Sequence, residues 1–184
     1  MASQGPALVA LCGSLRRESF NRRLLRLAVE VAQGQGARVD VVELRDLALP
    51  LYDGDLEAEQ GLPPGAEQLK ARIAAAQGLL IASPEYNHSI PGTFKNAIDW
   101  ATRGSNPFAG KVAALMGAST GGFGAVRSLQ HLRQVLMARG AWIVPALVTI
   151  SNAAQAFDEQ GRLKDAAMAK GLNGLVAALV ERLK

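Results

Sequence analysis

One segment near the start of the chain contains the unit from which the whole fold is predicted, Ala7-Leu8-Val9-Ala10-Leu11-Cys12-Gly13-Ser14-Leu15-Arg16-Arg17-Glu18-Ser19-Phe20-Asn21. Its first five residues form a continuous apolar run, which is typical of a strand buried on both faces of a parallel sheet. A polar loop follows, and from Phe20 onward apolar residues recur at helical spacing. A strand that leads through a polar loop into a helix is the unit from which open α/β sheets are built.

The same pattern recurs four more times along the chain. Further strands are predicted at 39–44, 78–82, 111–116 and 142–148, and each is followed by a helical pattern, the clearest at 93–102 and near the C-terminus. Five such units without a linker predict a single domain over residues 1–184. We expect a three-layer, doubly wound α/β fold whose five-stranded parallel sheet has the order 2-1-3-4-5, because crossovers are right-handed. Alternation in 39–44 and a proline at position 145 place the second and fifth strands at the edges.

Composition and charge exclude several classes of protein. The chain is 49% hydrophobic and 20% charged, and no apolar stretch approaches the roughly 18 residues of a membrane span. The segment Met1–Pro6 has no basic region, so no signal peptide is expected. A single cysteine fits a reducing, cytoplasmic location, and one cysteine with two histidines disfavours a metal site.

The net charge of +4 is spread over several helices. A nucleic-acid-binding surface would concentrate lysine and arginine on one element, so no nucleic-acid partner is expected. A moderately basic surface instead attracts small anions, including a phosphorylated nicotinamide cofactor.

The first loop carries the chemistry of a phosphate site. Free N–H groups at a helix N-terminus favour an anion, and hydroxyl and guanidinium groups add hydrogen bonds. The candidate residues are Ser14, Arg16, Ser19 and Asn21. The alternative is an ordinary helix cap at Ser19 beside solvated arginines.

A second loop, Pro84-Glu85-Tyr86-Asn87-His88-Ser89-Ile90-Pro91-Gly92, follows the third predicted strand. Two prolines constrain its backbone, and one aromatic ring with several polar groups suits a flat heteroaromatic ring. Because ligands bind at the carboxyl ends of strands in open α/β sheets, both loops would face one ligand. A phosphate site beside a ring site predicts a bound mononucleotide, and FMN is the best candidate.

The loop after the fourth strand admits two interpretations. Gly117-Ala118-Ser119-Thr120-Gly121 matches the G-x-S-x-G pattern of a hydrolase nucleophile. That chemistry needs an acid and then a histidine, and only His131 follows, inside the adjoining helix and with no acid between. We therefore favour a glycine-rich loop whose backbone approaches a flat ring closely.

Three other features of the sequence carry expectations. The connection from Arg45 to Pro64 is long enough to be a functional or interface loop. Trp100 falls off the apolar face of its helix and is either interfacial or covered by another segment. Cys12 is expected to be a small buried hydrophobe.

Taken together, these motifs make the chain resemble the NADPH-dependent FMN reductase family of flavodoxin-like proteins, and within it the quinone, chromate and azo-dye reductases. The resemblance is carried by Gly13-Ser14-Leu15-Arg16 with Ser19 and Asn21, Pro84-Glu85-Tyr86-Asn87, Ser89-Ile90-Pro91-Gly92, Lys95-Asn96-Ala97-Ile98-Asp99-Trp100, Gly110-Lys111, the loop 117–124 and His131-Leu132-Arg133-Gln134.

The resemblance implies a role for each candidate residue. It implies that the phosphate of FMN is held by Ser14, Arg16, Ser19 and Asn21. It implies that the flavin ring is lined by Pro84, Glu85, Tyr86 and Asn87 and closed over by Ser119, Gly121 and Gly122. The segments 123–126 and 148–162 match the family less well and would shape the substrate entrance.

The resemblance also implies an activity. NADPH or NADH would reduce bound FMN, which would then reduce a quinone, chromate, azo dye or free flavin in a ping-pong cycle, with no catalytic side chain. It implies homodimers or homotetramers. The alternative is a flavodoxin-type electron carrier without its own substrate, although such carriers are typically acidic.

Overall fold

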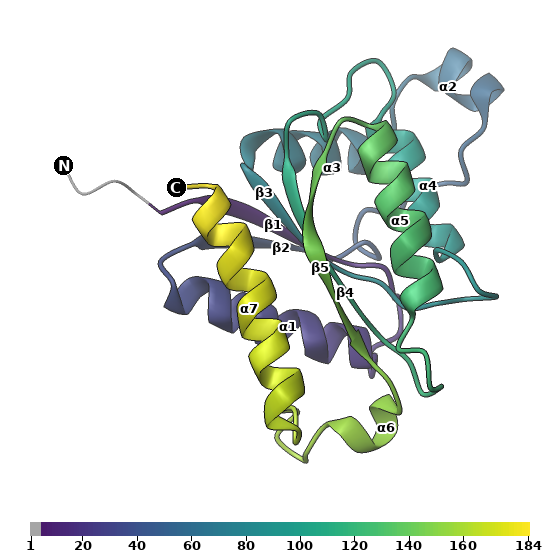
Figure 1. The fold of residues 1–184 in the computed structure, drawn as a ribbon. Coiled ribbons are helices and arrows are strands. Elements are labelled where there is room, and N and C mark those ends of the chain that lie inside the picture. The colour runs from purple at the N-terminus through teal and green to yellow at the C-terminus, as the bar shows by residue number, and fades with distance from the viewer. Residues whose placement is uncertain (1–4) are drawn as a thin grey trace.

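A computed structural model of the chain describes residues 5–184. The first four residues of the segment from which we expected no signal peptide lie outside the described part. The core of the structure is one parallel sheet with the strand order β2-β1-β3-β4-β5, which confirms the predicted topology (Figure 1). The strands are β1 (Ala7–Cys12), β2 (Arg38–Val42), β3 (Gly78–Ala82), β4 (Val112–Ala118) and β5 (Trp142–Ile150).

Helices cover both faces of this sheet. One face packs against α1 (Phe20–Gly34) and α7 (Ala166–Arg182), and the other against α3 (Pro64–Ala75), α4 (Gly92–Ala101) and α5 (Val126–Ala138). Strand β1 serves both layers, since Leu8 and Ala10 belong to the core under α1 and α7, whereas Val9 and Leu11 belong to the core on the other side. Burial on both faces explains the uninterrupted apolar runs of the central strands.

The two predicted edge strands lie at the edges of the sheet. In β5 the pairing with β4 shifts between Ala113 and Leu115, whose partners are Ile143 and Leu147. Pro145 lies inside this irregular stretch, where its missing N–H costs no ladder hydrogen bond. Strands β4 and β5 also run two residues further than predicted, to Ala118 and Ile150. The extension brings the loop after β4 against the end of β5.

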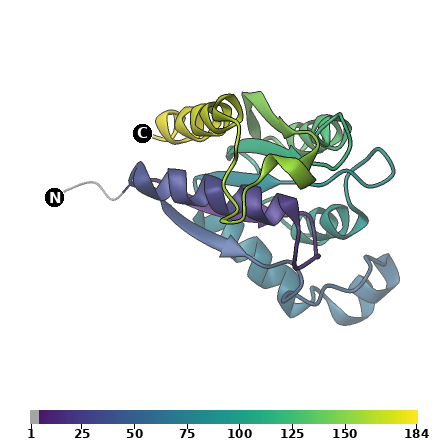
Figure 2. The same ribbon diagram turned by 90° about the horizontal axis from the view of Figure 1, so that it is seen from below.

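Two short helices were not predicted. Helix α2 (Gly54–Gln60) lies within the long connection and projects from the fold in both views (Figure 1, Figure 2). It contributes no buried residue, so it leaves no apolar periodicity in the sequence. Helix α6 (Ala153–Ala156) is a single turn after β5.

The long connection covers Trp100 and so decides between the two interpretations of that residue. Trp100 is completely buried; its indole N–H donates to the carbonyl of Pro50 at 2.9 Å, and its ring meets Tyr52 edge-to-face at 5.0 Å. Trp100 is therefore covered by another segment of the same chain, and it lends no support to a subunit interface. Within residues 5–184, none of the helices combines the length and the apolar content needed to cross a lipid bilayer.

Candidate functional site

Three loops meet at the carboxyl ends of β1, β3 and β4, which are neighbours in the sheet. They enclose a cleft of about 130 Å³ lined by Ser14, Arg16, Ser19, Phe20, Asn21, Pro84, Glu85, Tyr86, Ala118, Ser119 and Thr120. The strand order reverses between β1 and β3, and this is where open α/β sheets bind ligands. Eight of the eleven predicted site residues line this cleft. The other three, Asn87, Gly121 and Gly122, are exposed on the adjoining loops.

One end of the cleft is built to receive an anion. Helix α1 starts here, and the first turn of a helix leaves its N–H groups without intrahelical partners. Ser19 occupies the cap position, but its side chain makes no capping hydrogen bond, and no acidic residue lies in the first turn. The exposed Arg16 guanidinium forms neither an ion pair nor a hydrogen bond with the described residues. Unused donors beside a free cation fit the terminal phosphate of FMN.

The side chain of Asn21 is committed elsewhere. Its amide nitrogen donates to the carbonyl of Ala118 and its amide oxygen accepts from the N–H of Ala118, both at 2.8 Å. This buried pair fastens the start of α1 to the end of β4. Asn21 can therefore offer a phosphate its backbone N–H, while its side chain holds two walls of the cleft together.

The other end of the cleft is formed by a tight hairpin. The backbones of Tyr86 and Ser89 exchange two hydrogen bonds of 3.1 and 3.0 Å, and the central residues Asn87 and His88 have φ angles of 48° and 63°. Positive φ at both positions is the geometry of a type I′ turn. The Tyr86 hydroxyl reaches across the cleft to within 3.4 Å of the Ser14 hydroxyl. The half-exposed Tyr86 ring thus spans the two loops that were expected to hold the phosphate and the ring.

Among the described residues, no histidine, lysine or carboxylate is hydrogen-bonded to the hydroxyl of Ser119, as the hydrolase alternative would require. The hydroxyl of Ser119 accepts a hydrogen bond from the N–H of Gly121 at 3.2 Å. The His131 ring instead lies 3.0 Å from the hydroxyl of Ser89, on the hairpin. This arrangement makes Ser119 a loop residue of the cleft wall.

The carboxylate of Glu85 is directed at α5. It accepts hydrogen bonds from the N–H groups of Arg127 and Ser128 at 2.9 and 3.3 Å, and from the Arg127 guanidinium at 3.1 Å. Burial raises the pKa of this carboxyl, but the hydrogen bonds from Arg127 and Ser128 outweigh it and hold the pKa below its ordinary value. The negative charge of Glu85 is therefore compensated by Arg127 and Ser128 and does not repel an anion at the other end of the cleft.

The loop after β4 needs glycine at one position for reasons of packing. Gly124 has a φ of +57°, and a Cβ there would lie 2.9 Å from the backbone nitrogen of Ile150. A Cβ on Gly122 would meet nothing within 4 Å, so this glycine is free to face a ligand. Phe123 is 64% exposed, and the Arg127 guanidinium lies 4.5 Å from its ring centre. Sequence reasoning placed Phe123 at a substrate entrance but missed Arg127, which carries no motif.

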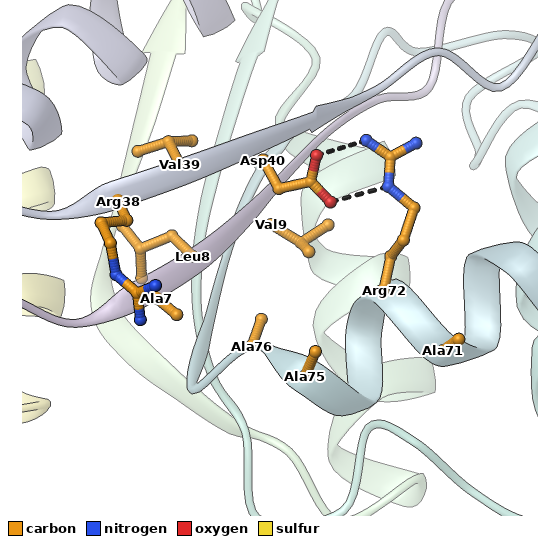
Figure 3. A pocket seen from close by; sticks show the side chains of 10 residues that line it. All are labelled: Ala7, Leu8, Val9, Arg38, Val39, Asp40, Ala71, Arg72, Ala75 and Ala76. Carbon is orange, nitrogen blue, oxygen red and sulfur yellow. Dashed lines mark hydrogen bonds and ion pairs between the residues drawn. The ribbon is translucent and has the colours of Figure 1, made fainter.

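A second hollow of about 550 Å³ lies between β1, β2 and α3 (Figure 3). It is lined by the first halves of β1 and β2, so it opens away from the carboxyl edge of the sheet. Its rim carries the ion pair of Asp40 and Arg72, whose two-pronged contact is drawn in Figure 3. The Asp40 carboxylate and the Arg72 guanidinium satisfy each other, whereas the exposed Arg38 also lines the hollow and has no ion pair among the described residues. Because open α/β sheets bind ligands at the carboxyl ends of their strands, the cleft remains the candidate site.

Comparison with known proteins agrees with this choice. Residues 6–155 match the family described as NADPH-dependent FMN reductase. The chain is 44% identical over 162 residues to an NAD(P)H-dependent FMN reductase of Pseudomonas aeruginosa, covering 86% of this chain and 84% of that protein. It is 40% identical over 185 residues to an NAD(P)H:quinone oxidoreductase of Solanum tuberosum, covering 97% and 94%.

Among solved structures, the chain resembles a flavoenzyme NAD(P)H:(acceptor) oxidoreductase of Paracoccus denitrificans. The two share 35% sequence identity and a TM-score of 0.81, and the match covers 96% of each chain.

Proposed function

The chain belongs to the NADPH-dependent FMN reductase family, and from that premise we propose that it binds FMN in the cleft and uses it to reduce a quinone with NAD(P)H. One observation carries the proposal. The anion end of the cleft combines an uncapped helix start with a free guanidinium at Arg16, at the residues that the family resemblance assigns to the phosphate of FMN.

Each wall of the cleft then has a task. The phosphate is bound by the first N–H groups of α1 and by the side chains of Ser14, Arg16 and Ser19. Pro84, Glu85, Tyr86 and Asn87 form the wall on one side of the ring, and Ser119, Gly121 and Gly122 form the other. FMN held there would supply the redox chemistry, namely hydride acceptance from reduced nicotinamide and electron donation to the acceptor. The protein binds FMN and the substrates, orients them and excludes water from the cleft. No side chain transfers a proton.

The acceptor and the kinetic mechanism are part of the proposal. A single narrow cleft spanned by Tyr86 leaves one approach, so the nicotinamide and the acceptor would use it in turn, in a ping-pong cycle. A flat quinone suits this opening, and chromate, azo dyes and free flavin are further acceptors to test. The basic net charge of +4 favours an enzyme with anionic small substrates over a flavodoxin-type carrier.

We also propose that residues 1–184 act as one domain and that the protein works in the cytoplasm as a homodimer or homotetramer. Large apolar side chains on the surface support self-association. Leu51, Met137 and Trp142 are all more than half exposed.

The deciding experiment is a visible spectrum of the purified protein followed by NADPH oxidation assays. We expect a yellow protein with flavin absorbance that oxidises NADPH in the presence of a quinone and no other protein. Bound flavin without NADPH oxidation would favour the electron carrier. A colourless protein that does not take up added FMN would refute the proposal.

A further inference from the structure

Helix α5 begins beside the cleft without a cap of its own. The residue at its cap position is Ala125, in a left-handed conformation with a φ of 69°, and a methyl group cannot accept a hydrogen bond. The N–H groups of the first turn of a helix need acceptors when they are shielded from water. Two of them, on Arg127 and Ser128, are satisfied by the carboxylate of Glu85, 42 and 43 residues earlier in the chain.

This capping joins the two loops on either side of the cleft. Glu85 belongs to the loop after β3, and α5 follows directly on the loop after β4. The joint is reinforced underneath by a contact of 3.2 Å between the hydroxyls of Ser83 and Ser128, which are both buried. It is reinforced at the hairpin by the 3.0 Å contact between Ser89 and His131.

The same carboxylate also fixes the side chain at the entrance. The Arg127 guanidinium donates to Glu85 at 3.1 Å and lies over the ring of Phe123. A cation held over a ring face is attracted to it, so the exposed ring is kept in one orientation. The Glu85 carboxylate therefore contacts both the start of α5 and the Arg127 side chain that lies over Phe123. It does so from the loop after β3, on the other side of the cleft.

We propose that Glu85 is a positioning residue, whose carboxylate sets the separation and alignment of the two loops that flank the flavin ring. The proposal rests on the proposed function, because it concerns the same cleft. Glu85 lines the cleft, and its carboxylate in addition acts through α5. When reacting groups are displaced by about 1 Å, the reaction rate can fall on the order of a hundredfold. Misalignment of these loops should therefore give a measurable loss of rate.

Asp165 provides a matched control. It caps α7 in the same way, accepting from the N–H groups of Ala167 and Met168 at 2.7 and 3.4 Å. It is exposed and does not line the cleft. Asp165→Asn and Glu85→Gln both replace a capping carboxylate by a neutral amide, but only the second touches the loops of the cleft.

The first measurement uses the protein without FMN. Hydrogen exchange should become faster in Glu85→Gln at the amides of Tyr86 and Ser89 and at those of Arg127 and Ser128, by about tenfold or more. Asp165→Asn should leave all four amides unchanged. Equal exchange in the two variants would overturn the proposal, whether or not the protein is a flavoenzyme.

The second measurement uses protein saturated with FMN. Per bound flavin, Glu85→Gln should lower kcat by about tenfold or more and alter the visible circular dichroism of the flavin, whereas Asp165→Asn should change neither. Glu85→Asp keeps the charge but is one methylene shorter, so it should not restore either signal. Full recovery with aspartate would mean that charge alone matters and would overturn the positioning role.

Glu85→Asp also serves if Glu85→Gln fails to fold, because it retains the capping charge. In that case the exchange and dichroism of Glu85→Asp are compared with wild type, and identical values would refute the proposal. Absence of flavin binding in the wild type would instead refute the proposed function, while the exchange experiment would still report on the joint between the loops.

Discussion

Arg16→Ala tests the phosphate end of the cleft most directly. Arg16 lines the cleft, and its exposed guanidinium forms no hydrogen bond or ion pair with the described residues, so it is free to bind an anion. Its removal should therefore cost little stability, because no hydrogen bond or ion pair among residues 5–184 is broken. It should weaken FMN binding, because the hydrogen bond between the guanidinium and the phosphate is lost. A hydrogen bond between charged groups contributes about 1.5–3 kcal/mol.

The exposure of Arg16 places the expected loss toward the lower end of that range. About 1.5 kcal/mol corresponds to roughly a tenfold rise in the Kd for FMN. The N–H groups of α1 and the hydroxyls of Ser14 and Ser19 remain, so binding should weaken without being abolished. Because the lost interaction is between exposed charges, the difference between wild type and variant should shrink at high salt.

The assay is fluorescence titration of the protein without FMN, first with FMN and then with riboflavin, which lacks the phosphate. Arg17→Ala is the matched control, since Arg17 is the next residue, is also exposed and does not line the cleft. We expect roughly tenfold weaker FMN binding for Arg16→Ala, less than about threefold for Arg17→Ala, and unchanged riboflavin binding for both. Equal losses in the two variants, or an equal loss for riboflavin, would refute the assignment of the phosphate.

Three further predictions concern the rest of the cleft. Ser119→Ala should retain NADPH oxidation to within about tenfold, since its hydroxyl makes one modest hydrogen bond, and stoichiometric labelling of Ser119 by a phosphonylating reagent would revive the hydrolase alternative. Steady-state kinetics with NADPH and a quinone should give parallel double-reciprocal lines, and intersecting lines would show that both substrates bind together. Tyr86→Ala should lower the rates of both half-reactions by on the order of a hundredfold, because Tyr86 spans the cleft. The pKa of Glu85 is lowered in the folded protein, so its contribution to stability is present above the unfolded pKa of about 4.3 and is lost as the pH falls through the folded value. The Tm advantage of wild type over Glu85→Gln should accordingly be largest above that unfolded pKa and should shrink in thermal unfolding as the pH is lowered through the folded value, and a constant difference would contradict this linkage.

Most of the fold could be predicted because its determinants are local. Apolar runs such as 78–82 are contiguous in the chain, and handedness then limits the order in which the strands can pair. The positions of the candidate loops follow from the same argument, since each loop joins a strand's carboxyl end to the next helix. Helix α2 escaped prediction because it buries no residue, and a helix without a buried face leaves no periodic signal.

The roles of individual side chains were decided only in the tertiary structure. Asn21 was expected to bind phosphate, yet its amide is paired with Ala118, 97 residues away. Glu85 was expected to line a ring, and its carboxylate caps α5. Trp100 could equally have been interfacial until the carbonyl of Pro50 was found to accept its N–H.

Short-range patterns and chain handedness set the layered α/β fold, the order of its strands and the edge at which polar loops gather, and both can be read from the order of the residues. The tertiary structure alone decided which of the gathered polar groups remain free for a ligand. A buried donor or acceptor must find a partner, and that partner can come from any part of the chain. Only after Asn21 and Glu85 have been paired does the free guanidinium of Arg16, beside the uncapped start of α1, stand out as the place for an anion.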